Sequence, residues 1–157
     1  MNAELIDDVF REAISHVDRK AAEHEISVEL ADDLLMAKMD VRLIVQVIIN
    51  IVNDAIKYTP EGSHICLSAK KEKKMVRIRI ADDGPGISDE AKLHLFDMFY
   101  TAGIGKADSR RGLGLGLSLC KSIVDAHGGE ISVSDNKPHG AVFSFTLPLE
   151  EVKFDHV

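Results

Sequence analysis

The chain has 157 residues, of which 45% are hydrophobic and 29% charged, a composition that predicts one globular domain with its own core. Its net charge of -7 argues against broad nucleic-acid binding, which needs a basic surface. No apolar run approaches the roughly 20 residues that span a bilayer, and the acidic, amphipathic N-terminus does not look like a signal peptide.

The first half of the chain predicts two helices and a strand. An apolar residue at every fourth position predicts an amphipathic helix over about residues 3–23. Alternating apolar and polar residues predict a strand over residues 26–30. Asp40 can cap a long helix that ends near Tyr58, because Pro60 follows.

The second half begins with a predicted hairpin. Residues 65–69 and 76–80 both alternate, and a polar turn within residues 70–74 joins them. Ser88 can cap a short helix that runs to about Tyr100.

A glycine-rich loop follows over residues 101–113, long enough to be a lid or a disordered segment. Leu115 to His127 reads as another helix, ended by Gly128 and Gly129. Two strands, 131–134 and 142–147, close the chain.

This order of elements predicts an α/β fold, a two-layer sandwich of a mixed sheet with helices on one face. We expect one domain over residues 1–157, with its core at about 24–149 and an N-terminal helix over 1–23. Cys66 and Cys120 lie far apart in apolar segments, which favours two reduced thiols in a cytosolic protein over a disulfide.

The segment Asp82-Asp83-Gly84-Pro85-Gly86 directly follows a strand that appears buried from its sequence. An aspartate at a strand end, followed by a tight glycine turn, can hold one carboxylate against a flat donor such as an adenine amino group. A plain Pro-Gly turn is the alternative, and it is the commoner origin of such a segment when nothing else accompanies it.

A second glycine cluster, Gly112 to Leu117, opens a predicted helix. Backbone N–H groups at a helix N-terminus bind phosphate, and glycines allow a close approach. The cluster is not a dinucleotide fingerprint, because Leu117 stands where glycine is needed and a loop precedes it. No Gly-Lys-Ser/Thr follows, so it is not a Walker loop either. A flexible hinge is the alternative.

The helix from Asp40 carries polar residues along one face. Asn50, Asp54, Lys57 and Tyr58 share that face by helical spacing. Their oxygen ligands suit Mg²⁺, the lysine suits phosphate and the aromatic ring suits a base. A solvated polar face is the alternative.

In this order the segments resemble the catalytic domain of histidine kinases, within the gyrase, Hsp90, histidine kinase and MutL ATPase superfamily. Residues 50–58 resemble its N box, 82–86 its first glycine box, 96–100 its F box and 112–117 its second glycine box. Each box alone is weak evidence for the family, but four boxes in this order are specific for it. Lys57-Tyr58-Thr59-Pro60, together with the Gly-Leu-Gly-Leu-Gly-Leu-Ser segment, points to the kinase branch rather than to the gyrase or MutL types.

The resemblance implies a Bergerat-type ATP-binding fold and a role for each matching position. Asp82 would bind the adenine amino group, Tyr58 would flank the base, and Asn50 and Asp54 would orient Mg²⁺. Asn50 and Lys57, which would contact phosphate, are the implied catalytic residues. The implied nucleotide-contacting positions are Asn50, Asp54, Lys57, Tyr58, Asp82, Gly84, Gly86, Ile87, Phe99, Gly112, Leu113, Gly114, Leu115 and Gly116.

Three positions depart from the family pattern. Asp54 stands where the family usually has asparagine, so it adds a negative charge near the polyphosphate, and we expect binding that weakens sharply without Mg²⁺. Thr101 stands where an arginine is frequent. Gly140-Ala141 carries less glycine than a last glycine box normally does.

None of the seven histidines has the acidic residue and proline that normally follow a phosphoacceptor. The resemblance therefore implies that the acceptor lies on a separate histidine-bearing dimerisation segment, which would pass phosphate to a response regulator. We expect this chain to be a monomer, to bind no nucleic acid, to be unable to phosphorylate itself, and to be the cytoplasmic part of a membrane sensor.

Three other functions remain open at this point. An anti-sigma-factor-type serine kinase shares the implied fold. Asp54 keeps open a degenerate, non-catalytic nucleotide-binding module. A non-nucleotide interaction domain would leave the order of the boxes unexplained. Within histidine kinases, the Phe-Tyr end of the F box and Asn136-Lys137-Pro138 resemble the Kdp-type potassium sensor kinases.

Overall fold

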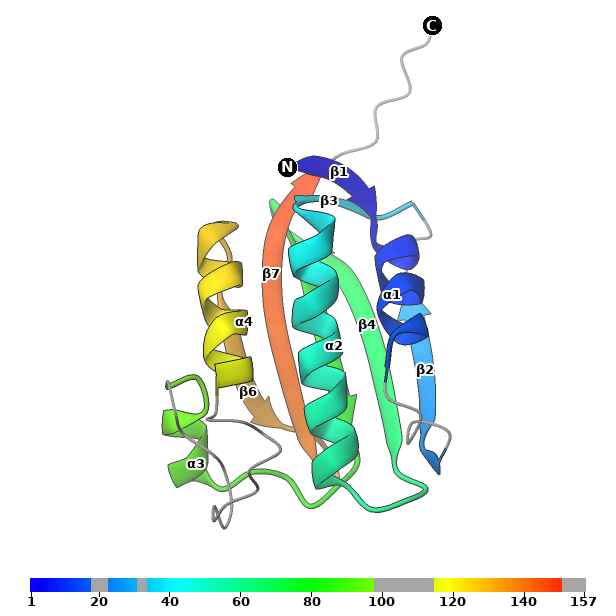
Figure 1. The fold of residues 1–157 in the computed structure, drawn as a ribbon, viewed down its shortest axis with the longest axis vertical. Coiled ribbons are helices and arrows are strands. Elements are labelled where there is room, and N and C mark those ends of the chain that lie inside the picture. Colours follow the sequence, from blue (N-terminus) through cyan, green and yellow to red (C-terminus); the bar gives the residue numbers. More distant parts are fainter. Residues whose placement is uncertain (18–22, 31–33, 98–114, 151–157) are drawn as a thin grey trace, which may run out of the picture.

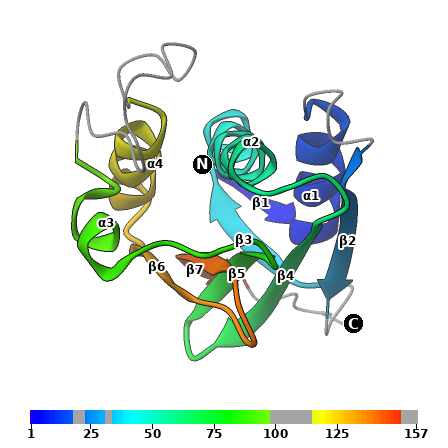
Figure 2. The same cartoon turned by 90° about the horizontal axis from the view of Figure 1, so that it is seen from below.

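The computed structural model describes residues 1–17, 23–30, 34–97 and 115–150. A seven-stranded sheet carries helices on one face (Figures 1 and 2). The elements in chain order are β1 (Asn2–Leu5), α1 (Ile6–Ser15), β2 (Glu25–Leu30), β3 (Met36–Met39), α2 (Val41–Tyr58), β4 (His64–Glu72), β5 (Met75–Asp82), α3 (Asp89–His94), α4 (Leu115–Ala126), β6 (Ile131–Asp135) and β7 (Ala141–Glu150).

The sheet is mixed, and the predicted α/β two-layer fold is confirmed. Its strand order is β1-β3-β7-β5-β4-β2, with β6 also paired to β7. Among the strands of the described residues, β2 and β4 run parallel and the other pairs are antiparallel. β7, the last described strand, pairs with three other strands. It pairs with β5 over residues 142–148, with β6 over 141–145 and with β3 over 149–150.

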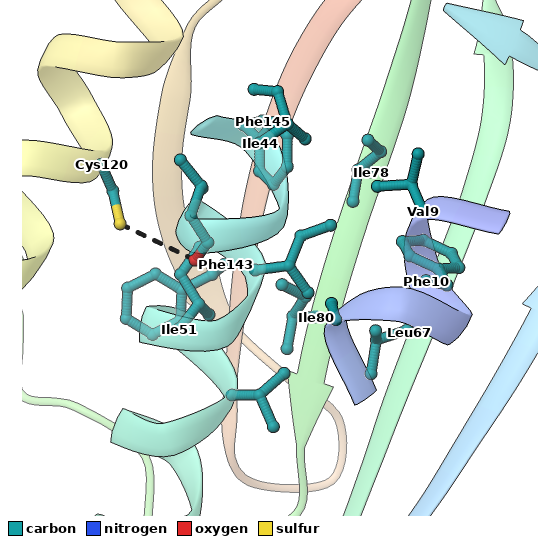
Figure 3. Packing of buried hydrophobic residues seen from close by; sticks show 14 of the residues in the cluster. Val9, Phe10, Ile44, Ile51, Leu67, Ile78, Ile80, Cys120, Phe143 and Phe145 are labelled. Atoms are coloured by element: carbon teal, nitrogen blue, oxygen red, sulfur yellow. Dashed lines mark hydrogen bonds between the residues drawn. The ribbon is translucent and has the colours of Figure 1, made fainter. Parts of the chain in front are cut away.

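Helix α2 is the central helix of the covering layer and lies between α1 and α4 (Figure 2). As predicted, the Asp40 carboxylate caps it by accepting a hydrogen bond from the backbone N–H of Arg42 at 3.2 Å. The helix ends at Tyr58, because the next residue, Thr59, precedes Pro60 and has an extended backbone. Its apolar face, including Ile44 and Ile51, packs on the sheet (Figure 3).

The predicted N-terminal helix over residues 3–23 is wrong at its start. Residues 2–5 form β1, an antiparallel partner of β3, and α1 covers only Ile6–Ser15. Leu5 fits the apolar period of the helix although it is the last residue of β1, so the pattern did not show where the strand ends and α1 begins. Strand β3 was missed because its four residues are too few to show alternation.

The N-terminal segment belongs to the core, so the core begins well before residue 24. Ile6, Val9 and Phe10 of α1 are fully or almost fully buried within one cluster that also holds Ile78 and Phe145 (Figure 3). Residues 18–22, the end of the predicted helix, lie outside the described residues.

Other predicted elements differ only in their limits. The hairpin turn is confined to residues 73–74, with Lys73 at φ 60°, so β4 and β5 are longer than expected. Ser88 caps α3, as predicted, but the helix ends at His94. Residues 98–114, including the predicted loop, lie outside the described part. Both cysteines are free thiols, and none of the helices described here is long and apolar enough to cross a bilayer.

A buried histidine ties α4 to the beginning of α2. His127 is 4% exposed, and its Nδ1 lies 2.7 Å from the carbonyl oxygen of Ile123. Since that oxygen can only accept, Nδ1 carries the proton, and Nε2 accepts a hydrogen bond from the Asp40 N–H at 3.0 Å. The His127 ring thus links the end of α4 to the start of α2.

We expect His127→Ala to lower the free energy of unfolding by about 2–4 kcal/mol, because it leaves a cavity and removes the partner of the Asp40 N–H. Urea denaturation of the variant and the wild type measures this loss. His94→Ala, at a histidine whose side chain is half exposed, is the matched control and should change stability by less than about 0.5 kcal/mol. Equal effects of the two changes would contradict the role given to His127.

Candidate nucleotide-binding site

A cavity of about 330 Å³ lies where β5 and α2 both end. This is the lower end of the molecule in Figure 1, beside α3. Its volume is within the range of small-molecule sites. Most of its walls are apolar, and its described lining residues are Asp54, Ala55, Tyr58, Thr59, Asp82, Pro85, Gly86, Ile87, Ser88, Ala91, Leu95, Leu117, Ala141 and Phe143.

Asp82 supplies a buried carboxylate to this cavity. It is 7% exposed, and its Oδ1 accepts hydrogen bonds from the N–H groups of Gly84 at 3.0 Å and Ala141 at 3.2 Å. The side chain of Asn136 donates to the Asp82 carbonyl at 2.7 Å. No described residue donates to Oδ2. The carboxylate is therefore fixed in place with one acceptor atom left for an N–H donor that enters the cavity.

The glycines around Asp82 are required by close packing of the chain on itself. A Cβ on Gly84 would lie 2.4 Å from the Thr59 methyl, and one on Gly140 would lie 2.0 Å from the Asp82 carbonyl oxygen. Gly86 has φ +83° and lies against the Gly140 carbonyl. Gly86 lines the cavity, whereas Gly84 does not and makes room for Thr59 instead.

Helix α2 brings only part of its predicted set to the cavity. Asp54 and Tyr58 line it, with Tyr58 41% exposed, while Asn50 and Lys57 do not. The Oδ1 of Asn50 accepts a hydrogen bond from the Gln46 side chain at 3.0 Å. Because Asn50 lies one helical turn from Asp54, the polar face leads out of the cavity along α2.

Helix α3 closes one side of the cavity through Ala91. Its position is fixed by the Ser88 cap and by an ion pair of 2.6 Å between Lys92 and Asp135 of β6. Hydrogen bonds to Asp135 and then Asp89 raise the pKa of Lys92. The helix is thus joined to the sheet on the side away from α2.

The sequence profile of the family described as histidine kinase-, DNA gyrase B- and HSP90-like ATPases matches residues 39–151. This chain belongs to that family. Within it, the chain is the ATP-binding catalytic domain of a sensor histidine kinase, as predicted, and the predicted fold of that domain is confirmed.

The most informative relatives of this kinase domain are a sensor protein and two kinases of known structure. Sensor protein KdpD of Clostridium acetobutylicum is 43% identical over 149 residues, 95% of this chain but 17% of that protein, which agrees with the predicted Kdp-type resemblance. The nucleotide-free catalytic domain of histidine kinase ThkA is 31% identical, with a TM-score of 0.82 and 94% of each chain covered.

ThkA has also been solved with the response regulator TrrA, at 29% identity and TM-score 0.77, over 94% of this chain and 41% of that one. Full-length ShkA in complex with AMPPNP is 25% identical, with a TM-score of 0.80, over 97% of this chain and 32% of that one. This kinase domain therefore spans a sixth to under a half of these longer chains.

Several implied site positions of the kinase domain lie outside its described residues: Phe99, Gly112, Leu113 and Gly114. Leu115 begins α4, and Gly116 lies in the first turn, where an added Cβ would meet nothing within 4 Å. Sequence reasoning missed the apolar walls, such as Leu95, Leu117 and Phe143, because apolar side chains carry no chemical signal. Thr59 could have been found, since it follows Tyr58 in the motif already singled out.

The buried thiol of Cys120, on α4, contacts the Asn50 side chain of α2. Asn50 donates from Nδ2 to the Cys120 sulfur at 3.8 Å, and that thiol donates to the Val47 carbonyl at 3.7 Å (Figure 3). Burial raises the pKa of Cys120 to about 12 from its ordinary value of 9.0. The group therefore stays a neutral thiol at physiological pH and does not act as a nucleophile.

We expect a thiol reagent such as DTNB to label only Cys66 in the folded kinase domain at mildly alkaline pH, since Cys66 is partly exposed and Cys120 is buried. Both thiols should react at similar rates once the chain is denatured. A Cys66→Ser variant that still reacts quickly when folded would contradict the inertness of Cys120.

Proposed function

We propose that this domain binds ATP with its adenine ring in the cavity, binds Mg²⁺ at the phosphates, and donates the γ-phosphoryl group to a histidine on a separate dimerisation segment. The observation that carries this proposal is the Asp82 carboxylate, which lines an apolar cavity and whose Oδ1 is held by two backbone donors while Oδ2 has no donor among the described residues. The exocyclic amino group of adenine is a donor of the right kind, and the apolar walls suit its ring.

Asn50 and Asp54 fit the requirements of a magnesium site. Side-chain oxygens are the ligands that Mg²⁺ prefers, and it commonly uses one or two of them together with substrate phosphates. The two residues are a helical turn apart on the face that leads out of the cavity. When bound, Mg²⁺ would neutralise charge on the phosphates and on the transferred group.

The protein residues in this proposal act by positioning and by charge. Asp82 would orient the base, Tyr58 would flank it, and the Lys57 ammonium, on the exposed side of α2, would contact phosphate. Phosphoryl transfer needs little covalent chemistry from the protein, so fixed geometry and charge stabilisation supply most of the rate. The acceptor histidine and, through it, a response regulator are proposed as partners; a ThkA structure with the response regulator TrrA supports the latter.

Asp54→Asn tests the magnesium part of the proposal. Removing a carboxylate beside the polyphosphate should strengthen AMPPNP binding in EDTA about tenfold, because a repulsion between like charges disappears. Calorimetry with and without Mg²⁺ gives the ratio of affinities, which is expected to be large in the wild type and smaller in the variant. Asp125→Asn removes the same charge from the exposed side of α4 and serves as the control.

Transfer itself is tested by mixing the domain with the histidine-bearing segment of the full-length protein and labelled ATP. Phosphorylation of the segment's histidine that requires Mg²⁺ would support the kinase function. Asp54 is the one observation that favours a non-catalytic module, so nucleotide binding without transfer in the wild type, and transfer in Asp54→Asn, would establish that second function instead.

A further inference from the structure

The chain is tied to the loop after α2 at the point where it enters β2. The Gly62 N–H donates to the carbonyl of Glu23 at 2.7 Å, and the Glu25 N–H donates to the carbonyl of Ser63 at 3.0 Å. These two bonds flank His24. Because the loop continues from the helix end that lines the cavity, residues 23–25 adjoin the nucleotide site through this loop.

His24 makes the connection to the cavity wall. Its Nε2 lies 2.9 Å from Thr59 Oγ1, and that hydroxyl donates its own proton to the carbonyl of Ala55 at 2.7 Å. The hydroxyl must therefore accept from His24, so Nε2 carries the ring proton and Nδ1 is an acceptor. Thr59 and Ala55 both line the cavity.

The second ring nitrogen of His24, Nδ1, is unusual for a buried polar atom. Nδ1 is buried, and no residue that the structure describes is its hydrogen-bond partner. A buried polar atom without a partner lowers stability, so a hydrocarbon side chain of similar size would stabilise the fold better at this position. What distinguishes histidine here is the N–H that it donates to Thr59.

Thr59 in turn bears on the turn that holds Asp82. The Thr59 methyl lies 2.4 Å from the position that a Cβ on Gly84 would take, so it packs closely on the Gly84 backbone. The Gly84 N–H in turn donates to Asp82 Oδ1. Rotation of the Thr59 side chain would remove this methyl from the Gly84 backbone, which is otherwise held by its N–H bond to Asp82 and by His139 at its carbonyl oxygen. The hydrogen bond from His24 and the one to the Ala55 carbonyl together hold the Thr59 rotamer.

We propose that His24 is a positioning residue for the nucleotide cavity, acting through Thr59 on the Asp82–Gly84 turn, so that residues 23–25 set the affinity for nucleotide. This inference rests on the proposed function, since it takes the cavity to be the nucleotide site. It also means that a displacement of the chain where it enters β2 would weaken nucleotide binding without a change in any residue that touches the ligand.

His24→Leu separates positioning from a structural role. The change removes both ring nitrogens, so the free energy of unfolding in urea should stay the same or rise, while AMPPNP affinity in Mg²⁺ by calorimetry should fall about three- to tenfold, the value of one hydrogen bond. His24→Gln, which can place an amide N–H near the same point, should recover most of the affinity. A residue with only a structural role would lower stability and leave affinity in the folded protein unchanged.

A double-mutant cycle completes the test. Thr59→Val keeps a methyl against Gly84 but lacks the hydroxyl, so His24→Leu should weaken binding much less in that background than in the wild type. Additive losses, or an unchanged affinity in folded His24→Leu, would overturn the proposal. Asp82→Asn is measured alongside: if the wild type binds and Asp82→Asn does not, the nucleotide site stands whatever His24 shows, whereas a folded wild type that binds no nucleotide overturns the proposed function itself.

Discussion

Asp82→Asn is expected to lower the affinity for AMPPNP at least about 100-fold while the domain stays folded. The variant keeps an oxygen that can accept from the Gly84 and Ala141 N–H groups, so the turn should keep its shape. The other carboxylate oxygen, Oδ2, is replaced by an amide NH₂, so an acceptor becomes a donor that would oppose the donor of the adenine amino group. A buried site that opposes two donors typically rejects its ligand by this amount or more. Calorimetry in Mg²⁺ measures the loss.

Asp83→Asn is the matched control for this change. Asp83 is the exposed neighbour, and its Oδ1 accepts from the His64 N–H, a bond that asparagine can also make. Its affinity should stay within about twofold of the wild type, because surface substitutions away from the ligand have small effects. An inosine nucleotide, which presents a carbonyl oxygen in place of the amino group, should bind Asp82→Asn better than it binds the wild type. Equal losses in both aspartate variants would contradict the role of Asp82.

Gly140→Ala is expected to lower the free energy of unfolding by at least about 3 kcal/mol. The new Cβ would lie 2.0 Å from the Asp82 carbonyl oxygen and 3.0 Å from the Asp83 Cα, so the backbone of one strand end must move. Gly140 also has φ +116°, which disfavours alanine by itself. Urea denaturation gives the stability. The displaced Asp82 should also weaken nucleotide binding in whatever fraction remains folded.

Gly128→Ala separates backbone strain from the clash. Gly128 has a positive φ of 79° too, but a Cβ there would meet nothing within 4 Å. Its loss should be about 1 kcal/mol, from strain alone. If the two glycine variants lose the same stability, the close approach of Gly140 to Asp82 does not matter energetically.

Local patterns predicted the long elements well and the short ones poorly. Helix α2 and the β4–β5 hairpin each show several full periods, so their sequences leave little choice of structure. β1 and β3 have four residues each and are strands because they pair with each other, which a local pattern does not reveal. The limits of α1 were misjudged for the same reason, since Leu5 suits either element.

The site shows the same division. Asp82 was predicted as a site residue because a carboxylate before a glycine turn can hold a flat donor and because the accompanying segments resemble, in order, the boxes of a known family. The need for Gly140 was not visible, because it comes from the approach of Asp82, a residue 58 positions earlier in the printed sequence. The contact of His24 with Thr59 joins residues 35 positions apart and was equally hidden. Asn50 and Lys57 were predicted from helical spacing, which fixes the face of α2 but does not say how far the cavity reaches along it.

The place of β7 in the sheet has a consequence for how the domain is made. β7 is the last of the described strands to be synthesised, yet β5, β6 and β3 all pair with it. A nascent chain that stops before residue 141 holds β4 and β5 with one open edge, and its β1–β3 ribbon has no sheet to join. Pairing of residues 36–37 with 149–150 closes nearly three quarters of the 157-residue chain into one loop. The domain therefore completes its fold only after the C-terminal strand has left the ribosome, in one late step governed by long-range contacts, and until then it exposes unpaired strand edges that favour aggregation.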